Sequence, residues 1–270
     1  MTVDATKPVE AAGCDLYYEV AGEGVPILLI PPAGSTASTW GSAAEELACI
    51  GRVITYDRWG YARSGGRPVR SVSTHTTDAA ELLQSLRAPP AIVVGTSAGA
   101  AIAVDLAVRR PDLVHAVISH EFPWRFTRQL PAASQVATLV RMGALTLRGR
   151  HADAAEALLR TAYAYGDGGT AWNAFPEEWR RAARENGRAA LADFRNSIAD
   201  YPSAAELATV GVPVVCSYGA RSPESMVRLT RSLAAAIPTA RTHRIEEAGH
   251  AAPFDATANF VQLIADTIVR

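Results

Sequence analysis

Two hydrophobic patterns alternate along most of the chain. Continuous apolar runs closed by Pro, Gly or polar residues indicate strands that are buried on both faces of a parallel sheet. Strands are predicted at 25–30, 52–57, 92–96, 114–119, 212–219 and 241–245, with an antiparallel edge strand at 14–22. Helices are predicted between them, at 42–50, 77–86, 98–108, 223–236 and 253–269. This alternation predicts right-handed crossover connections and an α/β fold.

Residues 122–201 break the alternation, because their pattern predicts helices alone. These helices are predicted at 131–148, 152–165, 170–186 and 188–200. We interpret 122–201 as a helical cap inserted into a core domain formed by 1–121 and 202–270. The cap holds ten of the 19 aromatic residues of the chain: Phe122, Trp124, Phe126, Tyr163, Tyr165, Trp172, Phe175, Trp179, Phe194 and Tyr201. Together they predict an apolar ceiling over a pocket.

Composition narrows the class of protein. The 270 residues are 49% hydrophobic with a formal net charge of -1, which allows one large core but gives no electrostatic footprint for nucleic acid or an anionic membrane. Cys14, Cys49 and Cys216 lie far apart, so we expect buried free thiols rather than disulfides or a thiolate metal site. No apolar run approaches about 18 residues and no signal peptide is evident, so we expect a cytoplasmic protein. A small molecule is the expected partner, and the chain is expected to be a monomer or a homodimer.

The segment Gly95-Thr96-Ser97-Ala98-Gly99 joins an apolar run to a helix rich in small residues. A sharp turn from strand to helix strains its central residue. Only very small residues two positions before and after it let the two backbones approach each other. Gly95 and Gly99 meet this requirement. The isolated pentapeptide is equally typical of an ordinary βα turn, so its chemistry depends on the partners of Ser97.

A serine hydroxyl needs an adjacent base near neutral pH, and the ordinary pKa of histidine suits that task. His250 is the candidate base, because it lies in an Ala-Gly-His loop after the last predicted strand. The other histidines fit less well: His75 and His151 are in polar segments expected to be exposed, His115 and His243 are inside strands, and His120 precedes a candidate acid.

Ser97, Glu121 and His250 each follow the carboxyl end of a predicted strand, where open α/β sheets place their ligands. Their order along the chain resembles that of the α/β-hydrolases. Residues 56–64 (YDRWGYARS) are also similar to the YDRxGxGxS turn of that family, in which Asp57, Arg58 and Arg63 are expected to hold the turn by hydrogen bonds. The resemblance covers nearly the whole chain. It implies a cofactor-free, esterase-like α/β-hydrolase fold: a mostly parallel eight-stranded sheet flanked by helices, with an inserted helical cap.

The resemblance also implies an oxyanion hole, which needs two backbone N–H donors. One is expected from Ala98, the residue after the nucleophile. The other is expected from the loop after Ile30, where the family usually has His-Gly and this chain has Pro31-Pro32. Proline has no N–H, so alignment gives Ala33 as the second donor, with Gly34 as the fallback.

The acid departs from the usual pattern of the family. Most relatives carry an Asp in a Gly-x-x-Asp setting after the next strand, and the residue at that position here is Ser222, which holds no charge. Two carboxylates are candidates to replace it. Glu224 follows a proline in the first turn of a helix, where the helix dipole already accounts for an acidic residue. Glu121 ends an apolar strand and needs a partner there. We therefore predict a hydrogen bond between Glu121 and His250.

These residues predict a serine hydrolase that cleaves a carboxylic ester or lactone of a mostly apolar small molecule (an EC 3.1.1-like reaction). Gly34, Phe122 and Trp124 are expected to bind the substrate. Two alternatives stay open: a lyase or cyclase of the same fold in natural-product tailoring, and a ligand receptor with vestigial hydrolysis. No Gly-x-Gly-x-x-Gly follows a strand, and no His/Asp/Glu spacing indicates a metal, so no cofactor or metal is expected.

Overall fold

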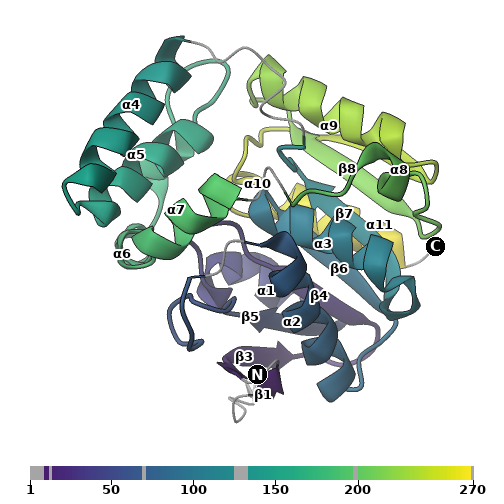
Figure 1. Cartoon of the computed structure of the whole chain (residues 1–270). Coiled ribbons are helices and arrows are strands. Elements are labelled where there is room, and N and C mark those ends of the chain that lie inside the picture. The colour runs from purple at the N-terminus through teal and green to yellow at the C-terminus, as the bar shows by residue number, and fades with distance from the viewer. Residues whose placement is uncertain (1–8, 12–13, 69–70, 125–132, 197–199, 269–270) are drawn as a thin grey trace.

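A mostly parallel sheet forms the centre of the molecule (Figure 1). The computed structural model describes residues 9–11, 14–68, 71–124, 133–196 and 200–268. Within them the sheet has seven strands in the order β3-β5-β4-β6-β7-β8-β9. Their bounds are β3 Tyr18–Ala21, β4 Pro26–Ile30, β5 Arg52–Tyr56, β6 Ala91–Thr96, β7 Val114–His120, β8 Val214–Gly219 and β9 Ala240–Ile245. Only β3 is antiparallel to its neighbour, and the other pairs are parallel, as the alternation predicted.

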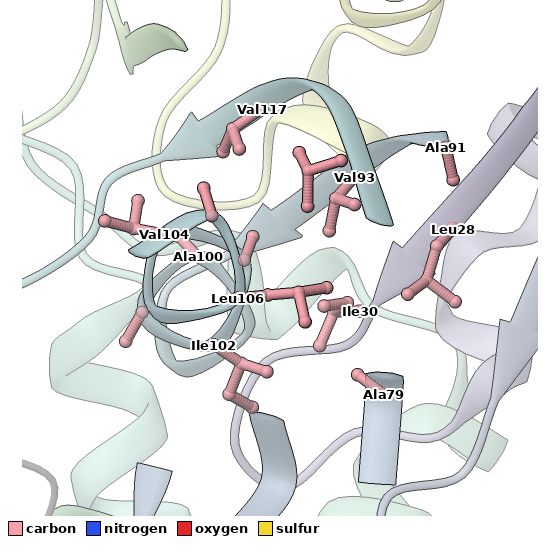
Figure 2. Packing of buried hydrophobic residues seen from close by; sticks show 14 of the residues in the cluster. Leu28, Ile30, Ala79, Ala91, Val93, Ala100, Ile102, Val104, Leu106 and Val117 are labelled. Atoms are coloured by element: carbon pink, nitrogen blue, oxygen red, sulfur yellow. The ribbon is translucent and has the colours of Figure 1, made fainter. Parts of the chain in front are cut away.

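Helices cover both faces of the sheet. The core helices are α1 Gly41–Leu47, α2 Val72–Ser85, α3 Ala98–Arg109, α8 Ala204–Leu207, α9 Glu224–Ala236, α10 Ala252–Asp255 and α11 Thr257–Ile268, with 3-10 turns at Ala37–Trp40 and Pro111–Leu113. Side chains alternate along β6, so Val93 packs with α3 on one face while Ile92 and Val94 pack with α1 and α11 on the other. Figure 2 shows the first face, where Ile102 and Leu106 of α3 lie among residues of β4 and β6.

The sheet has one strand fewer than the eight that the resemblance implied. The segment predicted as a single edge strand at 14–22 is divided at Tyr17. Its first part, β2 (Cys14–Leu16), pairs only with β1 (Val9–Ala11) in a separate two-stranded sheet. The N–H of Tyr17 donates to Ser64 Oγ and its carbonyl accepts from the N–H of Asp57. These bonds to the loop after β5 break the strand, so only β3 joins the main sheet.

Four helices of the described residues between β7 and α8 form a layer apart from the sheet, which we call the cap (Figure 1). They are α4 Ala133–Leu147, α5 His151–Ala162, α6 Glu177–Glu185 and α7 Gly187–Asn196, with a 3-10 turn at Ala171–Ala174. The predicted start of the first helix at 131 and end of the last at 200 involve positions outside the described residues. Trp172 and Phe175 pack with Ala251 and Phe254, which adjoin His250. Aromatic residues therefore join the cap to the core beside the expected base.

Two sequence expectations about burial are wrong. His75 was expected to be exposed, yet it lies on the buried face of α2 and is 3% exposed. All three thiols were expected to be buried, but Cys49 is exposed and only Cys216 among the described thiols is buried. The prediction took polar residues as a sign of exposure. On α2 this is wrong, because the helix buries polar side chains, including the carboxyl of Asp78, which is 1% exposed.

Asp78 should make the stability of the protein depend on pH. Burial, with a smaller contribution from Glu81, raises the pKa of its carboxyl to about 7, whereas the unfolded chain ionises near the ordinary value. The unfolded state therefore loses this proton first, and the carboxyl destabilises the fold increasingly as the pH rises from about 4 to 7. We expect Asp78→Asn to raise the free energy of unfolding at pH 8 by up to about 4 kcal/mol. Urea unfolding across this pH range measures it, and a difference from wild type that does not grow with pH would contradict it.

Candidate active site

The turn after β6 has the strained geometry of a nucleophile elbow. Ser97 has φ 53° and ψ -117°, in the region that side chains rarely adopt. A Cβ on Gly95 would lie 2.2 Å from the carbonyl oxygen of Gly99, and one on Gly99 would lie 2.1 Å from that of Ile30. Both glycines are thus required for the close approach of β6, α3 and β4, as the sequence predicted. The turn presents Ser97 to a cavity above the carboxyl ends of the strands.

Glu121 and His250 form the predicted hydrogen bond. His250 Nδ1 lies 2.7 Å from Glu121 Oε2, although the two residues are 129 positions apart. A carboxylate can only accept, so Nδ1 carries the proton and Nε2 is left with a free electron pair. Both side chains line the same cavity as Ser97. This arrangement gives His250 the tautomer that a general base requires.

The carboxylate of Glu121 is fully buried but well satisfied. Its Oε1 accepts hydrogen bonds from the N–H of Gly219, at 3.0 Å, and from the hydroxyl of Ser222. Burial raises the pKa of this carboxyl, but the hydrogen bond from His250, the neighbouring His120 and Ser222 outweigh burial and lower the pKa to about 2. Glu121 is therefore ionised at neutral pH.

Ser222, at the usual position of the acid, and Glu224, the other candidate carboxylate, have other environments. Ser222 donates a hydrogen bond to Glu121 and so supports the carboxylate that replaces it. Glu224 is exposed and begins α9, as the helix-dipole interpretation predicted.

The loop that carries His250 is held at the preceding residue. The carbonyl of Gly249 lies 3.1 Å from His120 Nε2, and its N–H donates to Asp255 Oδ2 at 2.9 Å. His120 Nδ1 in turn lies 3.1 Å from Ser217 Oγ. Burial lowers the pKa of His120, which favours a neutral ring that donates through Nε2 and accepts through Nδ1. His120 therefore supports the base by fixing its loop.

The loop after β4 forms a tight turn beside Ser97. The N–H of Ser35 reaches the carbonyl of Pro32 at 3.3 Å, and Gly34, the third residue of this turn, has φ 79°. Such a turn uses glycine at its third position. The N–H of its second residue, Ala33, takes no part in the hydrogen bond that closes the turn. Ala98 is the first residue of α3, where N–H groups lack partners within the helix. Ala33 and Ala98 both line the cavity, so the expected oxyanion donors are adjacent to Ser97.

The cavity has a volume of about 180 Å³ and lies between the cap and the sheet. Its apolar lining includes Leu139, Leu158, Leu159, Phe194, Met226 and Leu229. The polar lining outside the expected catalytic residues includes Thr138, Thr161 and Asp193. An apolar chamber with few polar groups suits a small, mostly apolar ligand.

The three residues expected to bind the substrate are not among those that line the cavity. Phe122 and Trp124 belong to the core cluster around α3; the ring of Phe122 packs edge-on against Tyr201, and Trp124 Nε1 donates to the carbonyl of Pro202. Neither lines the cavity, and nor does Gly34, where an added Cβ would lie 2.9 Å from Leu159 Cδ1. The first described helix of the cap, α4, begins at Ala133, and the first two aromatic residues, Phe122 and Trp124, belong to the core. Of the ten cap aromatics, Tyr163, Phe194 and Tyr201 line the cavity, and Phe126 lies outside the described residues.

Sequence reasoning missed the cap residue Asp193 and one contact of Arg58. Asp57 and Arg63 hold the turn after β5 through paired hydrogen bonds, as predicted. Arg58 reaches farther, to the carbonyl of Pro32 and to Asp193. One signal was available: Asp193 follows Ala189 and Ala190 at helical spacing, which places an acid on the apolar face of its helix.

Two other kinds of site are absent from the part of the chain that the structure describes. No cluster of three His, Cys, Asp or Glu side chains there could hold a metal ion. No helix in those ranges is long and apolar enough to cross a bilayer.

The fold and the site define an α/β hydrolase. The chain belongs to the alpha/beta hydrolase family, whose sequence profile matches residues 27–263. It is similar to an uncharacterized hydrolase, YraK of Bacillus subtilis, with 39% identity over 116 residues, or 42% of this chain and 43% of that protein. The matched segments span about two fifths of the length of the first curated relatives.

Solved structures show the same fold over nearly the whole chain. Est816, described as an N-acyl homoserine lactone degrading enzyme, is 22% identical with a TM-score of 0.78, covering 97% of this chain and 99% of that one. The enol-lactonase from Burkholderia xenovorans LB400 is 21% identical with a TM-score of 0.76, covering 97% and 100%.

Proposed function

We propose that the protein is a serine hydrolase that cleaves a carboxylic ester or lactone of a mostly apolar small molecule. The observation that carries this proposal is the 2.7 Å bond between His250 Nδ1 and Glu121 in the cavity that Ser97 also lines. The apolar lining supports a substrate with little charge, and two structural neighbours are named for lactone cleavage.

The reaction follows from these roles. His250 Nε2 takes the hydroxyl proton of Ser97 as Ser97 Oγ bonds to the acyl carbon. The N–H groups of Ala33 and Ala98 stabilise the oxyanion that forms. The bond to the alkoxy oxygen then breaks, and this oxygen takes the proton from His250. His250 then deprotonates a water molecule, which attacks the acyl carbon. The bond from this carbon to Ser97 Oγ breaks, Oγ takes the proton back from His250, and the carboxylic acid leaves. Glu121 stays ionised and stabilises the imidazolium throughout.

Covalent labelling tests the nucleophile. Intact-mass analysis after exposure to a fluorophosphonate should show one adduct, because the probe needs an activated serine. Ser97→Ala should lose the adduct, while Ser42→Ala, which changes an exposed serine of α1, should keep it. Conversion of a substrate without an adduct would favour the lyase or cyclase alternative. A protein that binds ligands but shows neither adduct nor turnover would favour the receptor.

A further inference from the structure

A buried carboxylate of the cap lies beside the loop that is expected to carry the oxyanion hole. Asp193, on α7, is 8% exposed. Its Oδ2 accepts hydrogen bonds from Arg58 Nη2 at 2.6 Å and from the Tyr61 hydroxyl at 2.5 Å. Its Oδ1 lies 3.5 Å from Nε2 of His75. Burial raises the pKa of Asp193, but the charge of Arg58 and these contacts outweigh burial and hold it well below its ordinary value. The carboxylate is therefore charged.

The two core residues that hold Asp193 also hold the turn of the oxyanion loop. Arg58 Nη2 donates to the carbonyl of Pro32 at 3.2 Å, and the Tyr61 hydroxyl oxygen interacts with the N–H of Gly34. These backbone groups stand on either side of Ala33. The cap carboxylate thus reaches both ends of the short segment that contains the expected donor.

The peptide geometry connects these contacts to the oxyanion. The carbonyl of Pro32 and the N–H of Ala33 belong to one trans peptide unit. Because that unit is planar, its C=O and N–H point in opposite directions. A hydrogen bond that fixes the Pro32 carbonyl on Arg58 therefore also fixes the direction of the Ala33 N–H. The positive charge of Arg58 polarises the same unit and strengthens the N–H as a donor.

We propose that Asp193 is a positioning residue for the oxyanion hole, acting from the cap through Arg58 and Tyr61. The proposal rests on the proposed hydrolase function. Asp193 holds the guanidinium of Arg58 in the orientation that reaches the Pro32 carbonyl. The oxyanion hole is then complete only while α7 is docked on the core.

Asp193→Asn tests this role because it removes the charge at nearly constant volume. The matched control is Asp153→Asn, which makes the same change to another cap carboxylate that pairs with two arginines, Arg150 and Arg184, away from the oxyanion loop. The probes are p-nitrophenyl acetate, whose small acyl group needs little contact with the cap, and a trifluoromethyl ketone. The ketone adds to the serine and places an oxyanion in the hole. Circular dichroism checks that each variant is folded.

Asp193→Asn should lower kcat for p-nitrophenyl acetate by about 10- to 100-fold and leave KM within about threefold. The inhibition constant of the ketone should rise by a similar factor. Asp153→Asn should leave all three quantities within about twofold. Tyr61→Phe, which removes the bridging hydroxyl and keeps the ion pair, should change kcat and the inhibition constant in the same direction by a smaller factor.

Several results would overturn the proposal. A folded Asp193→Asn protein with unchanged kcat and unchanged ketone affinity would show that Asp193 only fastens the cap, and so would a raised KM alone. If Asp193→Asn does not fold, Tyr61→Phe decides, and wild-type values in that variant reject the proposal. A wild-type protein that neither hydrolyses the ester nor takes up a fluorophosphonate would instead reject the hydrolase function itself, and the positioning role with it.

Discussion

Glu121→Gln should lower kcat by about 10²–10⁴ while the protein stays folded. The amide oxygen of the glutamine can still accept from Gly219 and Ser222, which turns its NH₂ group toward His250 Nδ1. The imidazole must then accept at Nδ1 and carry its proton on Nε2, so it cannot take the proton of Ser97. A neutral amide also fails to stabilise the imidazolium. Steady-state kinetics on an activated ester, with circular dichroism as the check on folding, measure the effect.

Glu224→Gln is the matched control, since it removes the other candidate carboxylate from the same region of the chain. Because Glu224 is exposed, its substitution should change kcat by less than about tenfold. Ser222→Ala should have an intermediate effect, because Glu121 loses one donor but keeps the N–H of Gly219. If Glu224→Gln were the more damaging of the two glutamines, the assignment of Glu121 as the acid would be wrong.

Gly99→Ala should lower the free energy of unfolding by about 3 kcal/mol or more and abolish labelling of Ser97. The added Cβ would lie 2.1 Å from the carbonyl oxygen of Ile30. Because the contacted atoms are backbone atoms, no flexible side chain can move away to relieve the clash. The helix α3 would have to shift from β4, which displaces the strained serine. Urea unfolding and fluorophosphonate labelling measure the two effects.

Gly143→Ala is the control for this substitution. A Cβ on Gly143, inside α4, would meet nothing within 4 Å. Alanine there should raise the stability by about 0.5–1 kcal/mol, because glycine is a poor helix former. An equally stable Gly99→Ala protein with normal labelling would show that the elbow does not need a glycine at this position.

Two buried carboxylates, Glu121 of the site and Asp78 of α2, have opposite effects on stability as pH changes. The lowered pKa of Glu121 stabilises the fold above the ordinary pKa of glutamate, and this contribution is lost as pH falls from about 4.5 to 2. The raised pKa of Asp78 destabilises the fold as pH rises from about 4 to 7. The hydrogen bonds to Glu121 stabilise its charged form and lower its pKa. At Asp78 burial dominates and raises the pKa.

The sequence alone determined the alternation of strands and helices, the glycines of the elbow, and the choice of Glu121 as the partner of His250. These depend on features that are local in the chain: apolar runs set buried strands, small residues allow a tight turn, and a carboxylate at the end of an apolar strand requires a donor. Only the tertiary structure decided which distant residues meet. It divided the edge strand at Tyr17, moved Phe122 and Trp124 into the core, and brought Asp193 of the cap to Arg58, 135 positions earlier. Such contacts depend on how a cap packs over a sheet, and hydrophobic periodicity carries no information about that packing.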